Sequence, residues 1–262
     1  MLAIIAGQGD LPKLIKDRTK GPSLVVALQG FAPNDIDVDL NFRLENLGAL
    51  LIELSRAGVR DVCFAGAVRR TVIDPAQIDD LTKPLIPKLT EALLGGDDGA
   101  LRAIFAIFED AGFNVTAAHE LIPDLLPPVG CQTKRKPDQD IDDEVRRASE
   151  VLNMVGHADI GQSCAVHRGQ MLAIEGVFGT DWMLESLKVR PDSGGGIFFK
   201  APKPGQDRRG DLPVISSQTV AKAADAGLDG IVIEEGGVMV LDMSNAIKEA
   251  DKRNIFLWVK RS

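Results

Sequence analysis

Short apolar segments alternate with amphipathic segments over the first part of the chain. Leu2–Ala6 and Leu24–Leu28 are apolar runs of strand length bounded by Gly or Pro, a pattern typical of strands buried on both faces of a parallel sheet. Between them, Leu11–Lys20 has its apolar residues at helical spacing, with Asp10 before it as an N-cap and Pro12 in its first turn, as helix starts favour. The pattern predicts a strand, a helix and a second strand.

The same alternation continues to residue 117. Asn46–Ala57 places its leucines on one face of a helix. Val62–Ala65 is predicted as the next strand and, after a proline-rich stretch, Leu101–Glu109 and Phe113–Ala117 are predicted as a helix and a fourth strand. Strands that alternate with helices form a parallel sheet covered by helices. We therefore expect a Rossmann-like domain over residues 1–130.

The character of the sequence changes after Pro123. Prolines and polar residues predict a linker at residues 131–140, before a second domain at 141–262. Helical spacing predicts helices at Ile141–Val155, Thr219–Ala226 and Asn245–Asp251. Turn residues predict two hairpins: Cys164–His167 with Met171–Glu175 around Arg168-Gly169-Gln170, and Ile231–Glu235 with Val238–Leu241 around Gly236-Gly237. The expected fold class is α/β, with an N-terminal Rossmann-like parallel sheet domain and a C-terminal mixed α/β domain.

Charge and composition narrow the classes of function. The 262 residues carry 30 Lys and Arg against 38 Asp and Glu, a net charge of −8, so the chain is poorly suited to neutralise the phosphates of a nucleic acid. Three scattered cysteines form neither a disulfide framework nor a metal motif. Gly7 and Gly9 interrupt the first apolar run, so we expect no signal peptide, and no run approaches the ~18 residues of a membrane span. We expect no nucleic-acid partner and a cytoplasmic location.

A glycine turn lies between the first predicted strand and helix. Gly7-Gln8-Gly9 stands where backbone amides and a helix N-terminus can bind a phosphate. Pro12 replaces the third glycine of the dinucleotide fingerprint, and no acid follows the second strand near Leu28 to bind a ribose. These departures disfavour a nicotinamide-dependent dehydrogenase. A tight turn without a ligand is the alternative interpretation.

Two further segments of the first domain are candidates for chemistry. Gly95-Gly96-Asp97-Asp98 precedes a predicted helix, so one aspartate is expected to cap that helix and the other is a candidate ligand of a hard cation such as Mg²⁺. His119-Glu120 follows the fourth strand, at the edge where open α/β sheets bind ligands. A structural pair is the commoner interpretation of these two residues.

The second domain contains the closest grouping of residues that could take part in chemistry. Glu175-Gly176 and Gly179-Thr180-Asp181 place two carboxylates and a hydroxyl on one turn after a strand. The segment Lys200–Pro213 then interleaves cations with prolines, glycines and acids. Its four cations are Lys200, Lys203, Arg208 and Arg209. In an acidic protein, a cationic loop of this kind is suited to bind phosphate, and a solvated surface loop is the alternative.

Asp225 is in a position that local electrostatics disfavour. It lies in the last turn of the predicted helix that ends at Gly227, where the helix macrodipole opposes an anion. Such local conflicts are more frequent at functional sites. Asp225 is therefore a candidate catalytic acid, with an isolated surface acid as the alternative.

The motifs occur in an order that resembles one family. They are LAIIAGQGDLP at Leu2–Pro12, GAVRR at Gly66–Arg70, GDDGALR at Gly96–Arg102, AHE at Ala118–Glu120, DIGQ at Asp159–Gln162, GVFGTD at Gly176–Asp181, KAPKPGQDRRGDLP at Lys200–Pro213 and AGLDGI at Ala226–Ile231. Together they resemble the LpxI-type UDP-2,3-diacylglucosamine pyrophosphatases of lipid A biosynthesis in Gram-negative bacteria, over nearly the whole chain. Gln8 stands where a glycine is common in that family.

The resemblance implies a two-domain enzyme that holds its ligand between the domains. It implies Mg²⁺-dependent hydrolysis of UDP-2,3-diacylglucosamine to UMP and 2,3-diacylglucosamine 1-phosphate (lipid X), with water attacking the phosphorus on the sugar side. The partner is then a lipid-linked nucleotide sugar. Peripheral contact with the cytoplasmic face of the inner membrane becomes an expectation, and a homodimer stays open as the assembly.

This chemistry gives the candidate residues roles. Cations neutralise the non-bridging oxygens of the pyrophosphate, while carboxylates orient the water or hold the metal. The expected catalytic residues are Asp225, Asp207 and Lys200, with Asp225 preferred as the acid. The expected metal ligands are Asp98, Asp181 and Asp225. The expected substrate-binding residues are Gly7, Gln8, Gly9, Arg69, Gln162, Thr180, Lys203, Gln206, Arg208 and Arg209.

Two other classes of protein remain as alternatives. A non-catalytic nucleotide-sugar binding protein would keep the glycine turn and the cationic loop but would release no UMP. An NAD-linked oxidoreductase is the second alternative, and the incomplete glycine motif disfavours it.

Overall fold

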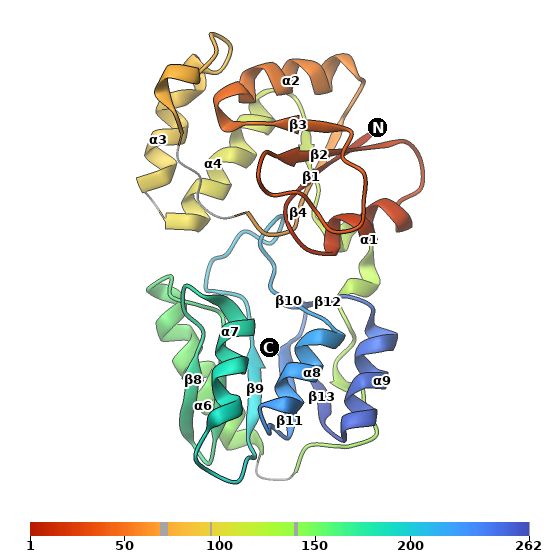
Figure 1. Cartoon of the computed structure of the whole chain (residues 1–262), viewed down its shortest axis with the longest axis vertical. Coiled ribbons are helices and arrows are strands. Elements are labelled where there is room, and N and C mark those ends of the chain that lie inside the picture. Colours follow the sequence, from red (N-terminus) through yellow and green to blue (C-terminus); the bar gives the residue numbers. More distant parts are fainter. Residues whose placement is uncertain (69–72, 95, 139–140, 262) are drawn as a thin grey trace. The chain divides into compact units, whose positions relative to one another are not determined.

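The computed structural model of the chain describes residues 1–68, 73–94, 96–138 and 141–261, and the side chains of residues 91–98 lie outside this description. The chain divides into two compact units, both drawn in Figure 1. Unit 1 is Met1–Pro123 together with Asp207–Asp211, and unit 2 is Asp124–Gln206 together with Leu212–Ser262.

Unit 1 is built on a parallel sheet with the strand order β3-β2-β1-β4-β5. Its strands are β1 (Leu2–Ala6), β2 (Ser23–Leu28), β3 (Leu40–Phe42), β4 (Asp61–Ala65) and β5 (Asn114–Val115). The apolar run of β1 is buried throughout, and Ile4 pairs with Val25 on one side and Cys63 on the other. The predicted parallel sheet is confirmed. Its strand order reverses between β1 and β4, the position at which such sheets bind ligands.

The helices of unit 1 contribute apolar side chains to its core. They are α1 (Leu11–Arg18), α2 (Leu47–Arg56), α3 (Ile86–Leu94), α4 (Gly96–Asp110) and α5 (Ala118–Leu121), with 3₁₀ turns η1 (Leu44–Asn46), η2 (Pro75–Gln77), η3 (Lys83–Leu85) and η4 (Pro123–Leu125). Leu47 and Leu54 of α2 share one core with Phe105 and Phe108 of α4. The sequence pattern missed α3, because its prolines predict an irregular stretch. Pro87 is the second residue of α3, where its missing N–H breaks no helical hydrogen bond.

Unit 2 contains a mixed sheet with the strand order β6-β13-β11-β9-β7-β8. Its strands are β6 (Gly130–Cys131), β7 (Ser163–His167), β8 (Gln170–Ile174), β9 (Ile197–Lys200), β11 (Gly230–Glu234) and β13 (Phe256–Lys260). Strands β9, β11 and β13 are parallel, whereas β6 and β7 run antiparallel to their neighbours. A separate parallel pair joins β10 (Val214–Ile215) to β12 (Met239–Val240). The prediction of a mixed α/β half is confirmed.

Helices cover both faces of the unit 2 sheet. They are α6 (Ile141–His157), α7 (Gly179–Ser186), α8 (Ser217–Asp225) and α9 (Met243–Arg253), with the 3₁₀ turn η5 (Leu187–Val189) after α7. Phe199 shares a core with Val145 of α6, whereas its neighbour Phe198 shares another with Met183 of α7 and Val220 of α8. Successive side chains of a strand point to opposite faces, so β9 contributes to both cores. None of the helices that the structure describes is long and apolar enough to cross a bilayer.

One predicted hairpin is confirmed and the other is wrong. Strands β7 and β8 pair antiparallel, and Arg168 and Gly169 both have positive φ (49° and 73°), as a type I′ turn requires. Around Gly236-Gly237, however, β11 and β12 do not pair with each other. Because β9 and β13 already occupy both edges of β11, the chain after Gly237 leaves this sheet and pairs with β10.

The residues predicted as a linker, 131–140, belong in part to the body of unit 2. Cys131 pairs with Trp258 of β13. Thr133 is buried and its hydroxyl oxygen accepts a 3.0 Å hydrogen bond from the backbone N–H of Leu257. The structure divides the two units at Pro123 and Asp124 instead, because the polar residues after Val129 find partners on β13 and its neighbours. Residues 139–140 lie outside the described part of the chain.

Candidate active site

Lys200 is a buried cation at the carboxyl end of β9. Its residue is 5% exposed, and its ammonium Nζ donates a 2.7 Å hydrogen bond to Thr180 Oγ1 at the start of α7. Burial lowers the pKa of Lys200, while the negative charges of Glu175 and Asp181 act in the opposite direction. An ammonium has three donors, so one bond to Thr180 leaves donors for an anion.

Glu175 organises the polar groups beside Lys200. It follows β8 directly and is 9% exposed. Its carboxylate accepts hydrogen bonds from Thr180 Oγ1 (3.1 Å, at Oε1) and Ser163 Oγ (2.7 Å, at Oε2). Ser163 lies opposite Lys200 in the β7–β9 ladder. A lysine, a carboxylate and two hydroxyls therefore form one cluster, buried except at the partly exposed Thr180. We call it the Lys200 cluster: Ser163, Glu175, Thr180 and Lys200.

The backbone around Glu175 explains one of the glycines. A Cβ built on Gly161 would lie 2.2 Å from the carbonyl oxygen of Glu175. Only glycine allows the segment before β7 to approach the end of β8 so closely. This contact brings Gln162, which the sequence predicted as a substrate-binding residue, next to the Lys200 cluster.

The first part of the predicted cationic loop continues this site within unit 2. The backbone N–H of Ala201 donates to the carbonyl of Gln162, and Gln206 Nε2 donates to Gln162 Oε1 at 3.3 Å. The N–H of Lys203 donates to Gln206 Oε1 at 2.9 Å, and Lys203 Nζ pairs with Asp159 at 2.6 Å. The structure thus brings together four predicted substrate-binding residues with Lys200: Gln162, Thr180, Lys203 and Gln206.

The second part of the loop belongs to unit 1, so the four cations do not form one site within a single unit. The Arg209 guanidinium donates to Asp207 through Nε (3.0 Å) and a terminal nitrogen (2.8 Å), and to Glu109 of α4 (2.5 Å). Its Cζ lies 5.0 Å from the ring centre of Phe105. Hydrogen bonds from Arg209 lower the pKa of Asp207, and those that Asp207 accepts raise the pKa of Arg209. Asp207 and Arg209 therefore anchor the loop to α4.

His119 and Arg208 lie near each other at the carboxyl edge of the unit 1 sheet. Burial, and then the positive charge of Arg208, lower the pKa of His119 against the opposing charge of Glu120. The Nδ1 atom of His119 is buried and has no hydrogen-bond partner among the described residues. Glu120 accepts a 2.9 Å hydrogen bond from the N–H of Ala117 and so caps α5. Glu120 therefore has a structural role, which agrees with the interpretation of His119-Glu120 as a structural pair.

The glycine turn after β1 packs against the segment after β4. The N–H groups of Gly7 and Gln8 donate to the carbonyls of Ala65 (2.7 Å) and Ala67 (2.9 Å). A Cβ on Gly7 would lie 2.6 Å from the Ala67 oxygen, so glycine is needed for this close approach. Two of the amides expected to bind phosphate are thus occupied by carbonyls. Binding by Gly7, Gln8 and Gly9 stays a prediction, and predicted Arg69 lies outside the described residues.

Asp225 lies at the amino edge of the parallel strands of unit 2, not with Lys200. It is the last residue of α8, which precedes β11, whereas Lys200 ends β9 at the opposite edge. Its carboxylate pairs with Arg253 at 2.5 Å and with Lys188 at 3.9 Å. These cations offset the macrodipole, so the position of Asp225 in the helix needs no catalytic explanation.

Two of the predicted metal ligands, Asp181 and Asp225, lie apart from each other. Asp181, in the first turn of α7, pairs with Lys222 at 2.6 Å, whereas Asp225 pairs with Lys188 beyond the end of that helix. At ~1.5 Å per residue, Asp181 and Lys188 are about 10 Å apart along α7 and the η5 turn that follows it. The side chain of Asp98 lies outside the description. Among the described residues, no three His, Cys, Asp or Glu side chains form a group that could hold a metal ion.

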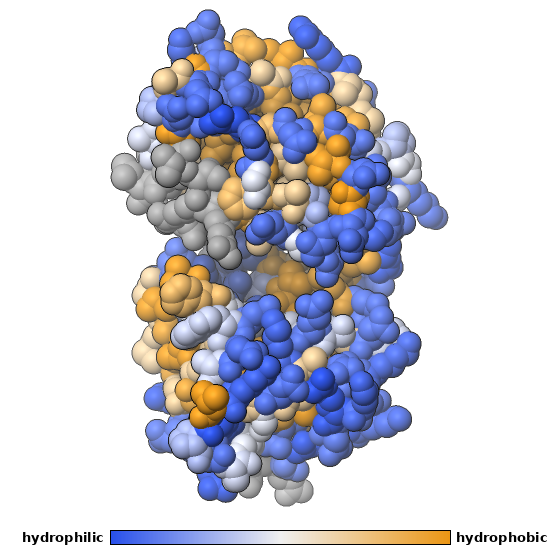
Figure 2. All heavy atoms as spheres, in the orientation of Figure 1, coloured by the Kyte–Doolittle hydropathy of each residue, from blue (hydrophilic) through white to orange (hydrophobic). Residues whose placement is uncertain are grey.

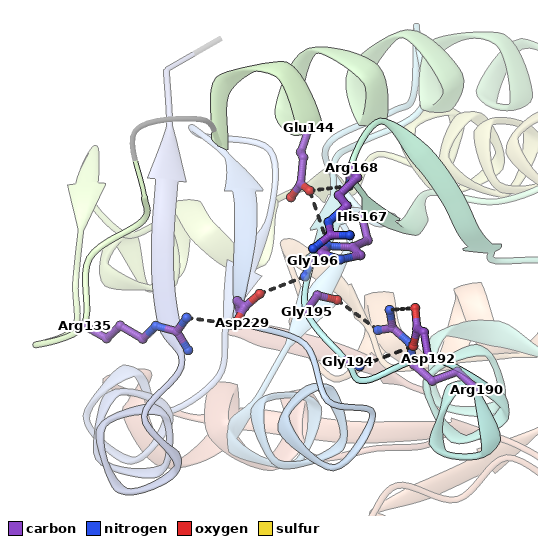
Figure 3. Close-up of polar contacts among 10 residues, drawn as sticks. All are labelled: Arg135, Glu144, His167, Arg168, Arg190, Asp192, Gly194, Gly195, Gly196 and Asp229. Atoms are coloured by element: carbon purple, nitrogen blue, oxygen red, sulfur yellow. Dashed lines mark hydrogen bonds and ion pairs between the residues drawn. The ribbon is translucent and has the colours of Figure 1, made fainter.

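A second polar network occupies the amino edge of unit 2 (Figure 3). Asp229 accepts hydrogen bonds from Arg135 (2.8 Å) and from the N–H of Gly196 (2.8 Å). The N–H of Gly195 donates to the carbonyl of Gly227, and Arg190 donates to the carbonyl of Gly195. The amides of Gly194, Gly195 and Gly196 therefore all donate to groups of the protein itself. The network holds the loop before β9 in place.

Comparison with known families places a domain boundary close to the break between Pro123 and Asp124. The family models of the LpxI N-terminal domain and the LpxI C-terminal domain match residues 1–125 and 128–258. The chain belongs to the LpxI family. The UDP-2,3-diacylglucosamine pyrophosphatase LpxI of Caulobacter vibrioides is 34% identical over 268 residues, which cover 98% of this chain and 96% of that relative. The resemblance found in the sequence motifs is confirmed.

Two members of the Lys200 cluster were not among the predicted site residues. The sequence places Glu175 on a polar turn without indicating a role for it, and none of the motifs contains Ser163. The signal for Ser163 is its place as a polar residue opening a buried strand. Its closeness to Lys200 depends on the β7–β9 register, which no local pattern contains.

Proposed function

We propose that this LpxI-family chain hydrolyses the pyrophosphate bond of UDP-2,3-diacylglucosamine in lipid A biosynthesis, releasing UMP and 2,3-diacylglucosamine 1-phosphate. Similarity to the Caulobacter pyrophosphatase over 98% of the chain supports the substrate. The observation that carries the chemistry is the buried Lys200 ammonium, which makes a hydrogen bond to Thr180 and is close to Glu175. A cation in a desolvated site attracts a pyrophosphate more strongly than one in water.

In the proposed mechanism, Lys200 and Lys203 neutralise the non-bridging oxygens of the pyrophosphate. Glu175 keeps the Thr180 hydroxyl oriented so that its oxygen faces Lys200. Water forms a bond to the phosphorus on the sugar side, the bond from that phosphorus to the bridging oxygen breaks, and UMP leaves with that oxygen. The proton of the water passes to solvent or to a nearby carboxylate.

Mg²⁺ remains the proposed cofactor. Mg²⁺ is commonly bound by one or two carboxylates together with substrate phosphates, and the exposed Asp181 beside Lys200 fits that limited role. When bound, the ion would supply positive charge to the pyrophosphate. The expected ligands Asp98 and Asp225 would help to bind the ion only if they approach the same phosphates.

The proposal is tested by following UMP release from UDP-2,3-diacylglucosamine with Mg²⁺ and with EDTA. We expect release with Mg²⁺, and in H₂¹⁸O the label should enter the sugar phosphate and not UMP. Label in UMP would overturn the site of attack. Binding of the nucleotide sugar without UMP release under any metal would identify a binding protein instead.

A further inference from the structure

Unit 2 exposes a group of apolar side chains where β8 ends and α7 begins. Ile174 is 40% exposed, Val177 91%, Phe178 71% and Trp182 60%. The rings of Phe178 and Trp182 contact each other, with centroids 5.2 Å apart. Figure 2 shows hydrophobic residues gathered on this part of the surface. Exposed apolar groups that lie together commonly mark a binding surface.

Ile160 extends this group. It is 52% exposed, and it precedes Gly161, whose backbone lies against the backbone of Glu175. Ile160 is therefore adjacent to the turn that carries Val177 and Phe178. We call the whole group the apolar rim: Ile160, Ile174, Val177, Phe178 and Trp182.

The apolar rim and the Lys200 cluster share one segment of chain. Glu175 and Thr180, which bind the other members of the cluster, alternate with rim residues between Ile174 and Trp182. The segment thus has polar side chains directed to Lys200 and apolar side chains exposed to solvent. An amphiphile with a pyrophosphate and two acyl chains presents the same combination of groups.

The small size of the rim and the pairing of the charges beside it indicate whether its partner is a protein or a bilayer. A standard interface between two proteins uses about 20–30 residues a side, far more than the five rim residues. A few aromatic and aliphatic side chains are enough to enter the interfacial zone of a bilayer, where Trp is favoured. The neighbouring charges are already paired, Asp181 with Lys222 and Asp159 with Lys203, so attraction to anionic lipid is not the driving force.

We propose that the apolar rim inserts into the surface of a lipid bilayer and holds the Lys200 cluster close to it. A diacyl substrate can then be engaged while its acyl chains stay in an apolar environment. The purpose of this contact rests on the proposed function, but the contact itself does not require substrate. The bilayer need not be anionic, because the insertion is apolar.

Trp182 reports on the contact directly. The chain has two tryptophans, so Trp258→Phe leaves Trp182 as the single fluorophore. With phosphatidylcholine vesicles and no substrate, we expect a blue shift of its emission and co-sedimentation that changes less than twofold between 50 and 500 mM salt. No shift and no co-sedimentation would overturn the proposal.

A matched pair of exposed valines makes the test specific. Val177 (91% exposed) is in the rim, whereas Val189 (86% exposed) is in η5 at the other end of α7. Val177→Ser with Phe178→Ser should weaken vesicle binding at least tenfold, and Val189→Ser should not change it. Equal binding by all three proteins would overturn the proposal. A shift from dimer to monomer on rim substitution, without loss of vesicle binding, would assign the rim to a contact between copies.

Activity separates this inference from the proposed function. The rim variant should keep wild-type turnover of a short-acyl substrate dispersed in water, but lose at least tenfold on diacyl substrate held in vesicles. Equal loss on both substrates would contradict a role at the bilayer surface. If the wild type releases no UMP from either substrate, the proposed function fails while the vesicle-binding result still stands.

Discussion

Ser163 and Lys200 face each other across the β7–β9 ladder, and the carboxylate of Glu175 accepts a hydrogen bond from the hydroxyl of Ser163. The contact depends on an antiparallel pairing between strands far apart in the sequence. It places an acid within electrostatic range of a buried lysine without a direct ion pair between them. Because burial lowers the pKa of Lys200, the pH dependence of activity tests the candidate site.

Replacing Lys200 by Met should remove the charge that binds pyrophosphate and keep most of the buried volume. We expect kcat/KM for UMP release to fall by about 10²–10³-fold. Circular dichroism and thermal melting should show a folded protein. Turnover within threefold of wild type would remove Lys200 from the mechanism.

The alkaline limb of the pH–activity profile should lie at lower pH than an ordinary lysine would give. Lys200 must be protonated to bind the anion, and burial lowers its pKa below 10.5, so activity should fall as pH rises through that lowered pKa. Lys200→Arg should move this limb to higher pH, because a guanidinium stays charged. An unchanged limb in kcat/KM measured from pH 6 to 10.5 would assign it to another group.

Glu175→Gln should shift the same limb in the opposite direction. The charge of Glu175 raises the pKa of Lys200, so a neutral isostere should lower that pKa further and move the limb to lower pH. Ser163→Ala is the matched control, because it removes a hydrogen bond to Glu175 but keeps the charge. It should lower the free energy of unfolding by about 1 kcal/mol, which urea titration can measure. The alkaline limb of the pH–activity profile should stay at the same pH.

Asp225→Ala should leave turnover within about threefold of wild type, because the residue lies at the opposite sheet edge from Lys200. Its partly exposed pairs with Arg253 and Lys188 predict a loss of no more than about 1 kcal/mol in unfolding free energy. A hundredfold loss of UMP release by a folded variant would support Asp225 as the catalytic acid.

Gly195→Ala tests the network at the amino edge of unit 2. Gly195 has φ of +98°, and a Cβ there would lie 2.7 Å from the His167 ring, so we expect a loss of about 2–3 kcal/mol in unfolding free energy. Gly169→Ala is the control, since its φ is +73° with open space around the added Cβ. It should lose about 1 kcal/mol. Equal losses would mean that the clash relaxes without cost.

Local sequence patterns were enough to predict the elements that local physics controls. The apolar run of β1 and the leucine face of α2 could be buried in only a few ways, and the Arg168-Gly169 turn requires positive φ. The Gly236-Gly237 hairpin failed because a turn signal does not report whether the strand edge is available. The same limit applies to Asp225, since sequence shows its conflict with the helix dipole but not the arginine on α9 that resolves it.

Motifs and periodicity in the sequence were sufficient to identify the family, the alternation of strands and helices, and the cationic segment after β9. Three features became visible only in the folded chain: which cations belong to the same unit, that Glu175 and Ser163 lie beside Lys200, and that Asp225 lies at the opposite edge of its sheet. This difference arises from the distance along the chain over which each interaction acts. Propensity and periodicity act over a few residues, whereas the Lys200 cluster depends on strand register and burial, which arise only when distant segments pack together.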